Sequence, residues 1–184
     1  MNSLDDNAVV ELSLKDPNAF SHIVERYESK LRRYIHRLGR FSIEDAQDIL
    51  QNTFIATYKN LNGFDRDLSF SSWIYRITHN ETISYIRKKG FKIQQRTIDS
   101  DDDILHIIPS EVNIEHDIDT KEMKQKLADV IQTLPQKYYD VFILHVSEQR
   151  SYQEISDILK IPLGTVGTRI NRSKAYIKKK LHTL

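Results

Sequence analysis

Hydrophobic residues recur every three or four positions through most of the chain, which is the period of an α-helix packed on one side. The clearest stretch opens with Asp16 as a cap and Pro17 at the first helical position, and it ends at Gly39. Its apolar stripe consists of Phe20, Val24, Tyr27, Leu31, Ile35 and Leu38. The chain lacks a run of alternating β-branched residues, so the pattern predicts an all-α fold.

Start and stop signals divide the first ninety residues into four helices. The expected ranges are about 3–14, 16–38, 42–59 and 72–89. Ser42 with Asp45 resembles a capping box, and Ser72 is expected to cap the fourth helix, which stops at Gly90. A loop over residues 61–71 precedes that helix.

The helical pattern is lost over residues 91–119. Eight acidic residues and no basic residue lie between Arg96 and Lys121, and Pro109 interrupts the segment. These features predict a flexible acidic linker between two small helical domains. The alternative is a poorly patterned part of a single domain.

Helices resume after Thr120, at about 121–133 and 135–146. Ser151 with Glu154 forms a good capping box for a short helix that ends near Lys160. A tight connection follows, and Thr165 is expected to cap a last helix that runs to about His182. Two helices joined by a tight turn, the second long and basic, indicate a helix-turn-helix DNA-binding module.

The last helix has an apolar face and an opposite polar face. Thr168, Asn171 and Arg172 share the polar face and would project into a major groove, where Arg can pair with guanine and Asn with adenine. Neighbouring basic residues, among them Arg169 and Lys174, would contact phosphates. The net charge of the chain is only +1, but residues 131–184 hold nine basic and four acidic residues. The alternative is a basic helix that is merely solvated.

Residues 62–91 mix aromatic, basic and amide side chains, a composition that suits single-stranded DNA because bases stack on rings and cations hold the backbone. Aromatic residues at helical spacing more often belong to a core, and we favour core packing for Trp73 and Phe54.

The sequence gives little support for a catalytic site, a metal site or a membrane-spanning segment. Cysteine is absent, and the seven histidines are scattered without a metal-binding or catalytic spacing. The N-terminus is polar and acidic, and no apolar run approaches the length of a membrane span. We therefore expect a cytoplasmic protein without catalytic residues, metal, cofactor or direct membrane insertion.

Four ordered motifs resemble the extracytoplasmic-function (ECF) group of RNA polymerase sigma factors. They are DPNAF at 16–20 with VERY at 24–27, EDAQDILQNTF at 44–54, FSSWIYRI at 70–77 with RKK at 87–89, and LP at 134–135 with SYQEI at 151–155 and IPLGTV at 161–166. The resemblance covers most of the chain outside residues 91–119. It implies a region 2-like domain over residues 1–90, an acidic linker over 91–119 that threads toward polymerase channels, and a region 4-like domain over 120–184.

The resemblance also implies partners and site residues. The partners would be core RNA polymerase, through its beta-prime and beta subunits, promoter DNA and an anti-sigma factor. Polymerase docking would involve Asp45, Asp48, Gln51 and Phe54. The −10 element would be melted and recognised by Asn62, Gly63, Phe64, Trp73, Arg76, Asn80, Arg87 and Lys88. The −35 element would be recognised by Thr165, Thr168, Arg169, Asn171, Arg172 and Lys174.

Three positions depart from the family pattern. Gly167 stands where Lys or Arg is frequent, Ser84 replaces the usual acid, and Asn52 stands where Glu is common. These departures bear on promoter preference. The competing hypothesis is a helix-turn-helix repressor or activator with a helical N-terminal sensor domain.

Overall fold

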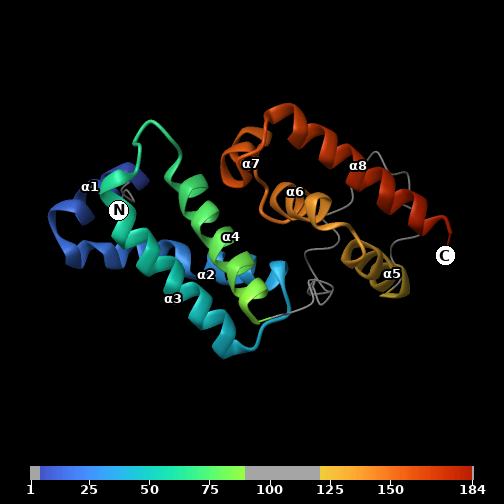
Figure 1. Cartoon of the computed structure of the whole chain (residues 1–184), viewed down its shortest axis with the longest axis horizontal. Helices are drawn as coiled ribbons and strands as arrows, with labels where there is room; N and C mark the ends of the chain where they lie inside the picture. The colour runs from blue at the N-terminus through green and yellow to red at the C-terminus, as the bar shows by residue number, and fades with distance from the viewer. Residues whose placement is uncertain (1–4, 90–120, 184) are drawn as a thin grey trace. The chain divides into compact units, whose positions relative to one another are not determined.

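A computed structural model describes residues 5–89 and 121–183, and every regular element within these ranges is a helix (Figure 1). The chain divides into two compact units, one built mainly from the helices within residues 5–89 and the other mainly from those within residues 121–183. The predicted all-α fold of two helical units is confirmed. The predicted acidic linker over residues 91–119 lies outside the described residues.

The N-terminal unit follows the predicted order of helices. Its elements are α1 (Asp6–Lys15), the 3-10 helix η1 (Pro17–Phe20), α2 (Ser21–Leu38), α3 (Ile43–Asn60), the 3-10 helix η2 (Leu61–Gly63) and α4 (Phe70–Lys89). Asp16 caps the turn that contains Pro17, and Ser42 accepts a hydrogen bond from the backbone N–H of Asp45 at 3.0 Å. The caps expected at Asp16 and Ser42 are therefore confirmed.

Two expected caps are wrong by about one helical turn. α4 begins at Phe70, and the Ser69 hydroxyl accepts from the backbone N–H of Ser72 at 3.2 Å, so Ser69 occupies the role expected of Ser72. The last helix begins at Leu163 after Pro162, which places Thr165 inside its first turn. In α4 the ring of Phe70 is 2% exposed, so packing of this ring favours the earlier start of the helix.

Four fully buried threonines occupy α3 and α4, which pack along each other. Thr53 and Thr57 lie on α3, and Thr78 and Thr82 lie on α4. Each of these four hydroxyls donates to the carbonyl four residues earlier, at 2.7 to 2.9 Å, so none of the four threonines is buried with an unsatisfied donor. These short side chains allow the backbones of packed helices to approach closely.

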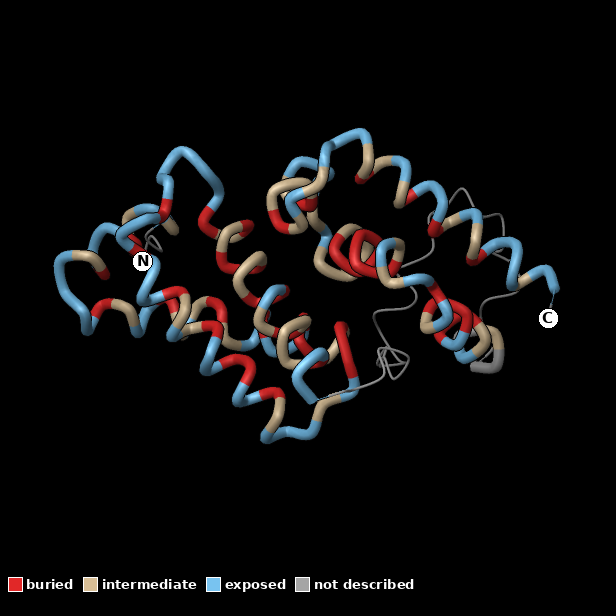
Figure 2. The backbone as a smooth tube through the Cα atoms, viewed as in Figure 1, coloured by how far each residue is buried: buried red, intermediate tan, exposed pale blue. Residues whose placement is uncertain are grey.

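The C-terminal unit contains α5 (Lys121–Gln132), α6 (Gln136–Val146), α7 (Tyr152–Leu159) and α8 (Leu163–Leu181). α8 packs against both α5 and α6. Its buried residues include Val166, Ile170 and Ile177, which share one face of the helix. Buried and exposed positions alternate along each helix with the period that the sequence shows (Figure 2).

A bilayer-spanning helix is not found within residues 5–89 and 121–183: each helix there is too short or too polar.

Candidate functional site

An apolar groove of about 540 Å³ runs between α3 and the segment formed by η1 and α2. On α3 its lining includes Gln47, Gln51, Phe54 and Tyr58, which fall on one stripe of the helix. The opposite side is lined by Pro17, Phe20, Val24 and Glu28. A groove of this size and composition can accept apolar side chains from another protein.

Aromatic rings shape the groove. Phe20 meets Tyr58 edge to face with ring centroids 5.1 Å apart, and it meets Phe54 in the same manner at 6.5 Å. Tyr58 is 46% exposed and Ile55 is 44% exposed, so large apolar groups remain accessible at the rim. An exposed apolar patch flanked by polar residues is typical of a protein-binding surface.

The four residues predicted to dock on polymerase do not form one surface in the structure. Gln51 and Phe54 line the groove, and Asp48 is exposed on the same helix outside the lining. Asp45 faces α4, where its carboxylate accepts a short hydrogen bond from the Tyr85 hydroxyl and lies 3.8 Å from Nζ of Lys89. The carboxylate of Asp45 therefore ties the start of α3 to the end of α4.

The Asp45 contacts change the titration of their partners. The hydrogen bond to Asp45 raises the pKa of Tyr85, because deprotonation would place two negative groups together. The pKa of Lys89 is also raised, first by its hydrogen bond with Tyr85 and further by the charge of Asp45. Both shifts extend to higher pH the range in which the phenol stays neutral and the ammonium stays charged.

The segment from Asn62 to Lys88 contains buried residues that support the structure and exposed residues that can contact a partner. Asn62 and Gly63 are exposed at the end of η2. Phe64 is only 7% exposed, and its ring packs against Phe70 at 5.3 Å and Trp73 at 5.1 Å. The ring of Phe64 thus supports the following loop from beneath, and it offers little area for stacking on a base.

Polar and basic residues continue this surface along α4. Trp73 and Arg76 are half-buried, whereas Asn80, Arg87 and Lys88 are exposed. Their spacing of three, four and seven residues places Trp73, Arg76, Asn80 and Arg87 along one side of the helix. This side can present an aromatic edge, an amide and cations to a nucleic-acid strand.

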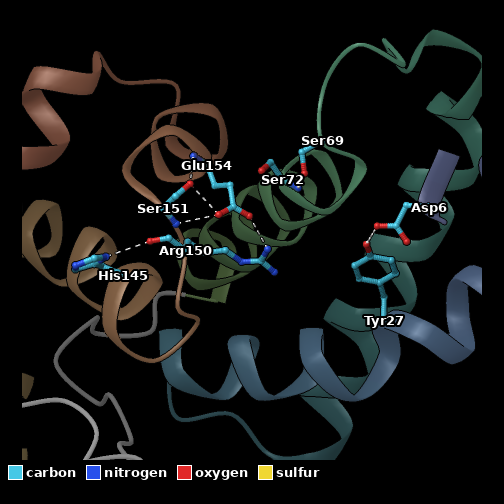
Figure 3. Close-up of polar contacts among 8 residues, drawn as sticks. All are labelled: Asp6, Tyr27, Ser69, Ser72, His145, Arg150, Ser151 and Glu154. Carbon is cyan, nitrogen blue, oxygen red and sulfur yellow. Dashed lines mark hydrogen bonds and ion pairs between the residues drawn. The ribbon is translucent and has the colours of Figure 1, made fainter.

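Local contacts fix both ends of α7, the first helix of the helix-turn-helix module. The hydroxyl of Ser151 accepts from the backbone N–H of Glu154, and the Glu154 carboxylate accepts from the backbone N–H of Ser151, at 3.2 and 2.9 Å (Figure 3). Arg150 also donates to Glu154 at 2.9 Å. Lys160 ends the helix with a left-handed backbone, φ 52°, which directs the chain into the turn before α8. The capping box predicted at Ser151 and Glu154 is confirmed.

On α8 the predicted DNA-contacting residues differ in exposure. Thr168, Asn171 and Arg172 are exposed, whereas Thr165, Arg169 and Lys174 are half-buried. The Thr168 hydroxyl donates to the carbonyl of Gly164 at 2.8 Å, so its methyl group and its lone pairs are what remain for DNA.

Sequence reasoning missed a contribution from α6 to this surface. The guanidinium of Arg172, on the neighbouring helix α8, is the main cause that lowers the pKa of Tyr138. The ammonium of Lys137 lies 5.1 Å from the centroid of the Tyr138 ring. α6 therefore adds a phenol and a cation beside the exposed face of α8. No local signal marked these residues, because the contact joins positions 34 residues apart in the sequence.

Gly167 faces the ring of Tyr152, the first residue of α7. A Cβ atom at position 167 would lie 3.5 Å from Cε2 of Tyr152, an ordinary van der Waals distance. We therefore expect Gly167→Ala to stabilise the C-terminal unit by up to about 1 kcal/mol through helix propensity. Urea unfolding followed by far-UV circular dichroism checks this result, and a loss of stability would mean that the ring cannot accommodate a methyl group.

Comparison with known proteins identifies the chain. The sequence profile of Sigma-70 region 2 matches residues 23–92, and that of Sigma-70, region 4, matches residues 124–177. The ECF RNA polymerase sigma factor SigW of Bacillus subtilis is 35% identical over 174 residues, which cover 92% of each chain. The chain belongs to the ECF RNA polymerase sigma factors. The function of this family is promoter-specific initiation of transcription, and the region 2 match replaces the alternative of an N-terminal sensor domain.

Other relatives agree with this placement of the sigma factor. The ECF RNA polymerase sigma-E factor of Escherichia coli strain K12 is 30% identical over 190 residues, covering 98% of this chain and 96% of its own. Among solved structures, CnrH in complex with the cytosolic domain of CnrY superposes with a TM-score of 0.69 at 22% identity over 97% of both chains. RpoE in complex with the anti-sigma factor NepR from Bartonella quintana has a TM-score of 0.62 at 20% identity, over 89% of this chain and 96% of its own. The structural likeness supports the fold.

Proposed function

We propose that this sigma factor uses three separate surfaces to bind core RNA polymerase, the −10 element and the −35 element. The groove face of α3, with Gln51, Phe54 and the exposed Asp48, docks on core RNA polymerase through the beta-prime and beta subunits. The observation that carries the proposal is the position of this apolar groove. η1, α2 and α3 line it, and the candidate DNA side of α4 contributes no residue to it.

The −10 element is assigned to the end of η2 and to α4. Asn62 and Gly63 are exposed beside a loop supported by Phe64, and Arg76, Asn80, Arg87 and Lys88 extend the surface along α4. A strand separated from its complement can lie along such a surface, with its phosphates held by cations. Trp73 borders the surface and packs on Phe64 at the same time.

The −35 element is assigned to α8, with α6 in support. Arg172 and Asn171 provide the side chains that pair best with guanine and adenine. Arg169 and Lys174 are assigned to phosphates, together with the three lysines that end the helix. Thr165 and Thr168 border the same side of the first two turns.

The domain limits and further partners complete the proposal. Residues 1–90 form the region 2-like domain, 91–119 an acidic linker directed to positively charged polymerase channels, and 120–184 the region 4-like domain. An anti-sigma factor is a proposed partner, because the solved structures of CnrH and RpoE contain CnrY and the anti-sigma factor NepR, respectively. The sigma factor itself supplies no catalytic group in this proposal, since bond formation belongs to polymerase.

Two substitutions separate DNA recognition from docking. Arg172→Ala removes a side chain that can donate two hydrogen bonds to one base, so we expect −35 binding of the holoenzyme to weaken by about 1–3 kcal/mol with relaxed base preference. Asp48→Ala should instead reduce affinity for core polymerase and leave base preference unchanged. Titration of core polymerase and of −35 duplexes with each variant measures both effects. Unchanged polymerase affinity for Asp48→Ala would remove Asp48 from the docking surface.

A further inference from the structure

α1 is joined to the candidate −10 surface by a continuous set of contacts. Its residues Val9 and Val10 are 2% and 0% exposed, and the helix contacts both η2 and α4. The Sigma-70 region 2 match begins at residue 23, so α1 lies outside the matched segment. What α1 contributes must therefore be inferred from its own contacts.

Asp6, the first residue of α1, makes two strong polar contacts with α2. One carboxylate oxygen accepts from the hydroxyl of Tyr27 at 2.5 Å (Figure 3). The other lies 2.7 Å from the guanidinium of Arg26. The side chains of Arg26 and Asp6 are 27% and 32% exposed, so water only partly screens the pair. A carboxylate bound by a hydroxyl and a guanidinium fixes the orientation of the Tyr27 ring.

The Tyr27 ring is the first member of an aromatic chain that ends beneath the loop. It packs edge to face on Phe70 at 5.7 Å, and Phe70 packs on Phe64 at 5.3 Å and on Trp73 at 5.6 Å. Phe64 directly follows η2, and Trp73 borders the candidate DNA side of α4. A displacement of the Tyr27 ring would therefore shift Phe64 at one end of the surface and Trp73 at the other, since packed rings transmit displacements.

α1 also reaches the loop directly. The side-chain amide of Asn7 donates to the carbonyl of Arg66 at 3.5 Å. The charge of Arg66 contributes to lowering the pKa of Glu11, after the larger contributions from Lys15. The loop after η2 is thus held from the side by α1 and from beneath by the rings.

We propose that Asp6 is a positioning residue for −10 recognition: its contact with Tyr27 holds the aromatic chain and, with it, the loop that follows η2. The inference rests on the proposed assignment of the −10 element to η2 and α4. Asp6 does not contact DNA in this account. Its effect is to reduce the number of conformations that the loop must give up when a strand binds.

The test uses holoenzyme assembled from core polymerase and the full-length chain. Its probe is a fork-junction DNA library with a constant duplex and a randomised single strand at the −10 position, and sequencing of bound DNA gives the preference. Asp6→Ala and Tyr27→Phe should each lower discrimination among −10 sequences about three- to tenfold. The double variant should lose no more than Asp6→Ala alone, because both single variants remove the Asp6–Tyr27 contact.

Lys15→Ala is the matched control, since it removes an exposed charge from the same helix without touching α2. The affinity for core polymerase should be unchanged in all variants. Equal losses of polymerase affinity and −10 discrimination would mean a general effect on folding and would overturn the inference, as would wild-type discrimination in Tyr27→Phe. If the wild-type holoenzyme shows no −10 preference, the underlying assignment of the −10 surface fails instead.

Discussion

Acidification should destabilise the N-terminal unit through His79, by about 3 kcal/mol between about pH 8 and about pH 4. This histidine is 9% exposed on α4, its Nδ1 lies 2.9 Å from the hydroxyl of Tyr34, and its ring stacks on the Tyr34 ring. Burial lowers the pKa of His79 from 6.5 to about 4, because the imidazolium would lose its hydration. The unfolded chain takes up this proton near pH 6.5 and the folded chain only near pH 4. Stability is therefore retained above pH 6.5 and lost as the pH falls between these values.

The chain offers a direct measurement of this effect. Its single tryptophan, Trp73, lies on α4, so urea unfolding followed by tryptophan fluorescence reports on the N-terminal unit. His79→Asn is the informative variant, since an amide can bond Tyr34 and does not titrate. The difference in unfolding free energy between the wild type and His79→Asn should change as the pH falls from 6.5 to about 4. Parallel pH profiles for the two proteins would show that His79 is not buried in its neutral form.

Truncation of Phe54 should cause the largest loss of polymerase binding. The ring lines the groove beside Phe20, and it is half-buried, so it is accessible to a partner. Aromatic residues at the centre of an interface often contribute about 2–4 kcal/mol, and we expect a loss of this size for Phe54→Ala. Equilibrium binding of the labelled full-length protein to core polymerase measures it.

Ile43→Ala provides the control for Phe54→Ala. Ile43 is a 72% exposed apolar residue on the same helix, and it does not line the groove. Its truncation should leave polymerase affinity within about 0.5 kcal/mol of the wild-type value. Docking through the groove would be disproved by equal effects of the two substitutions.

Local signals predicted the helices and several of their ends well. Ser42, Ser151 and Asp16 act as caps because each bonds backbone N–H groups two or three residues ahead, an interaction that the sequence alone reveals. The starts of α4 and α8 were displaced by about one turn. At α4, several serines can act as the cap, and burial of Phe70 favours the earlier start, whereas α8 begins at Leu163 directly after Pro162 without a side-chain cap.

The groove could not be predicted from periodicity. Phe20 belongs to the apolar stripe of the sequence, but Pro17–Phe20 forms a 3-10 helix with three residues per turn, so its phase differs from that of α2. Phe20 and Val24 line the groove, whereas Tyr27, Leu31 and Ile35 remain in the core, so members of one apolar stripe divide between a surface and the core.

Polar contacts between residues far apart in the sequence could not be predicted either. Asp45 had the sequence context of a docking residue, yet its carboxylate bonds Tyr85, forty residues away. Asp6 with Tyr27 and Arg172 with Tyr138 are contacts of the same kind. Such pairs depend on how helices pack, which a single sequence does not specify. The roles of the candidate site residues in binding polymerase and DNA remain predictions for the experiments described above.

Transcription start sites produced by purified core RNA polymerase with and without this protein test the central claim most directly. Genomic DNA is the template, and sequencing of the 5′ ends of the transcripts identifies the start sites. We predict start sites that depend on the protein and that share two upstream elements near −35 and −10. The −35 element should lose its base preference when Arg172→Ala replaces the wild type. Unchanged start sites, or tight binding of the free protein to a palindromic duplex without polymerase, would contradict the account.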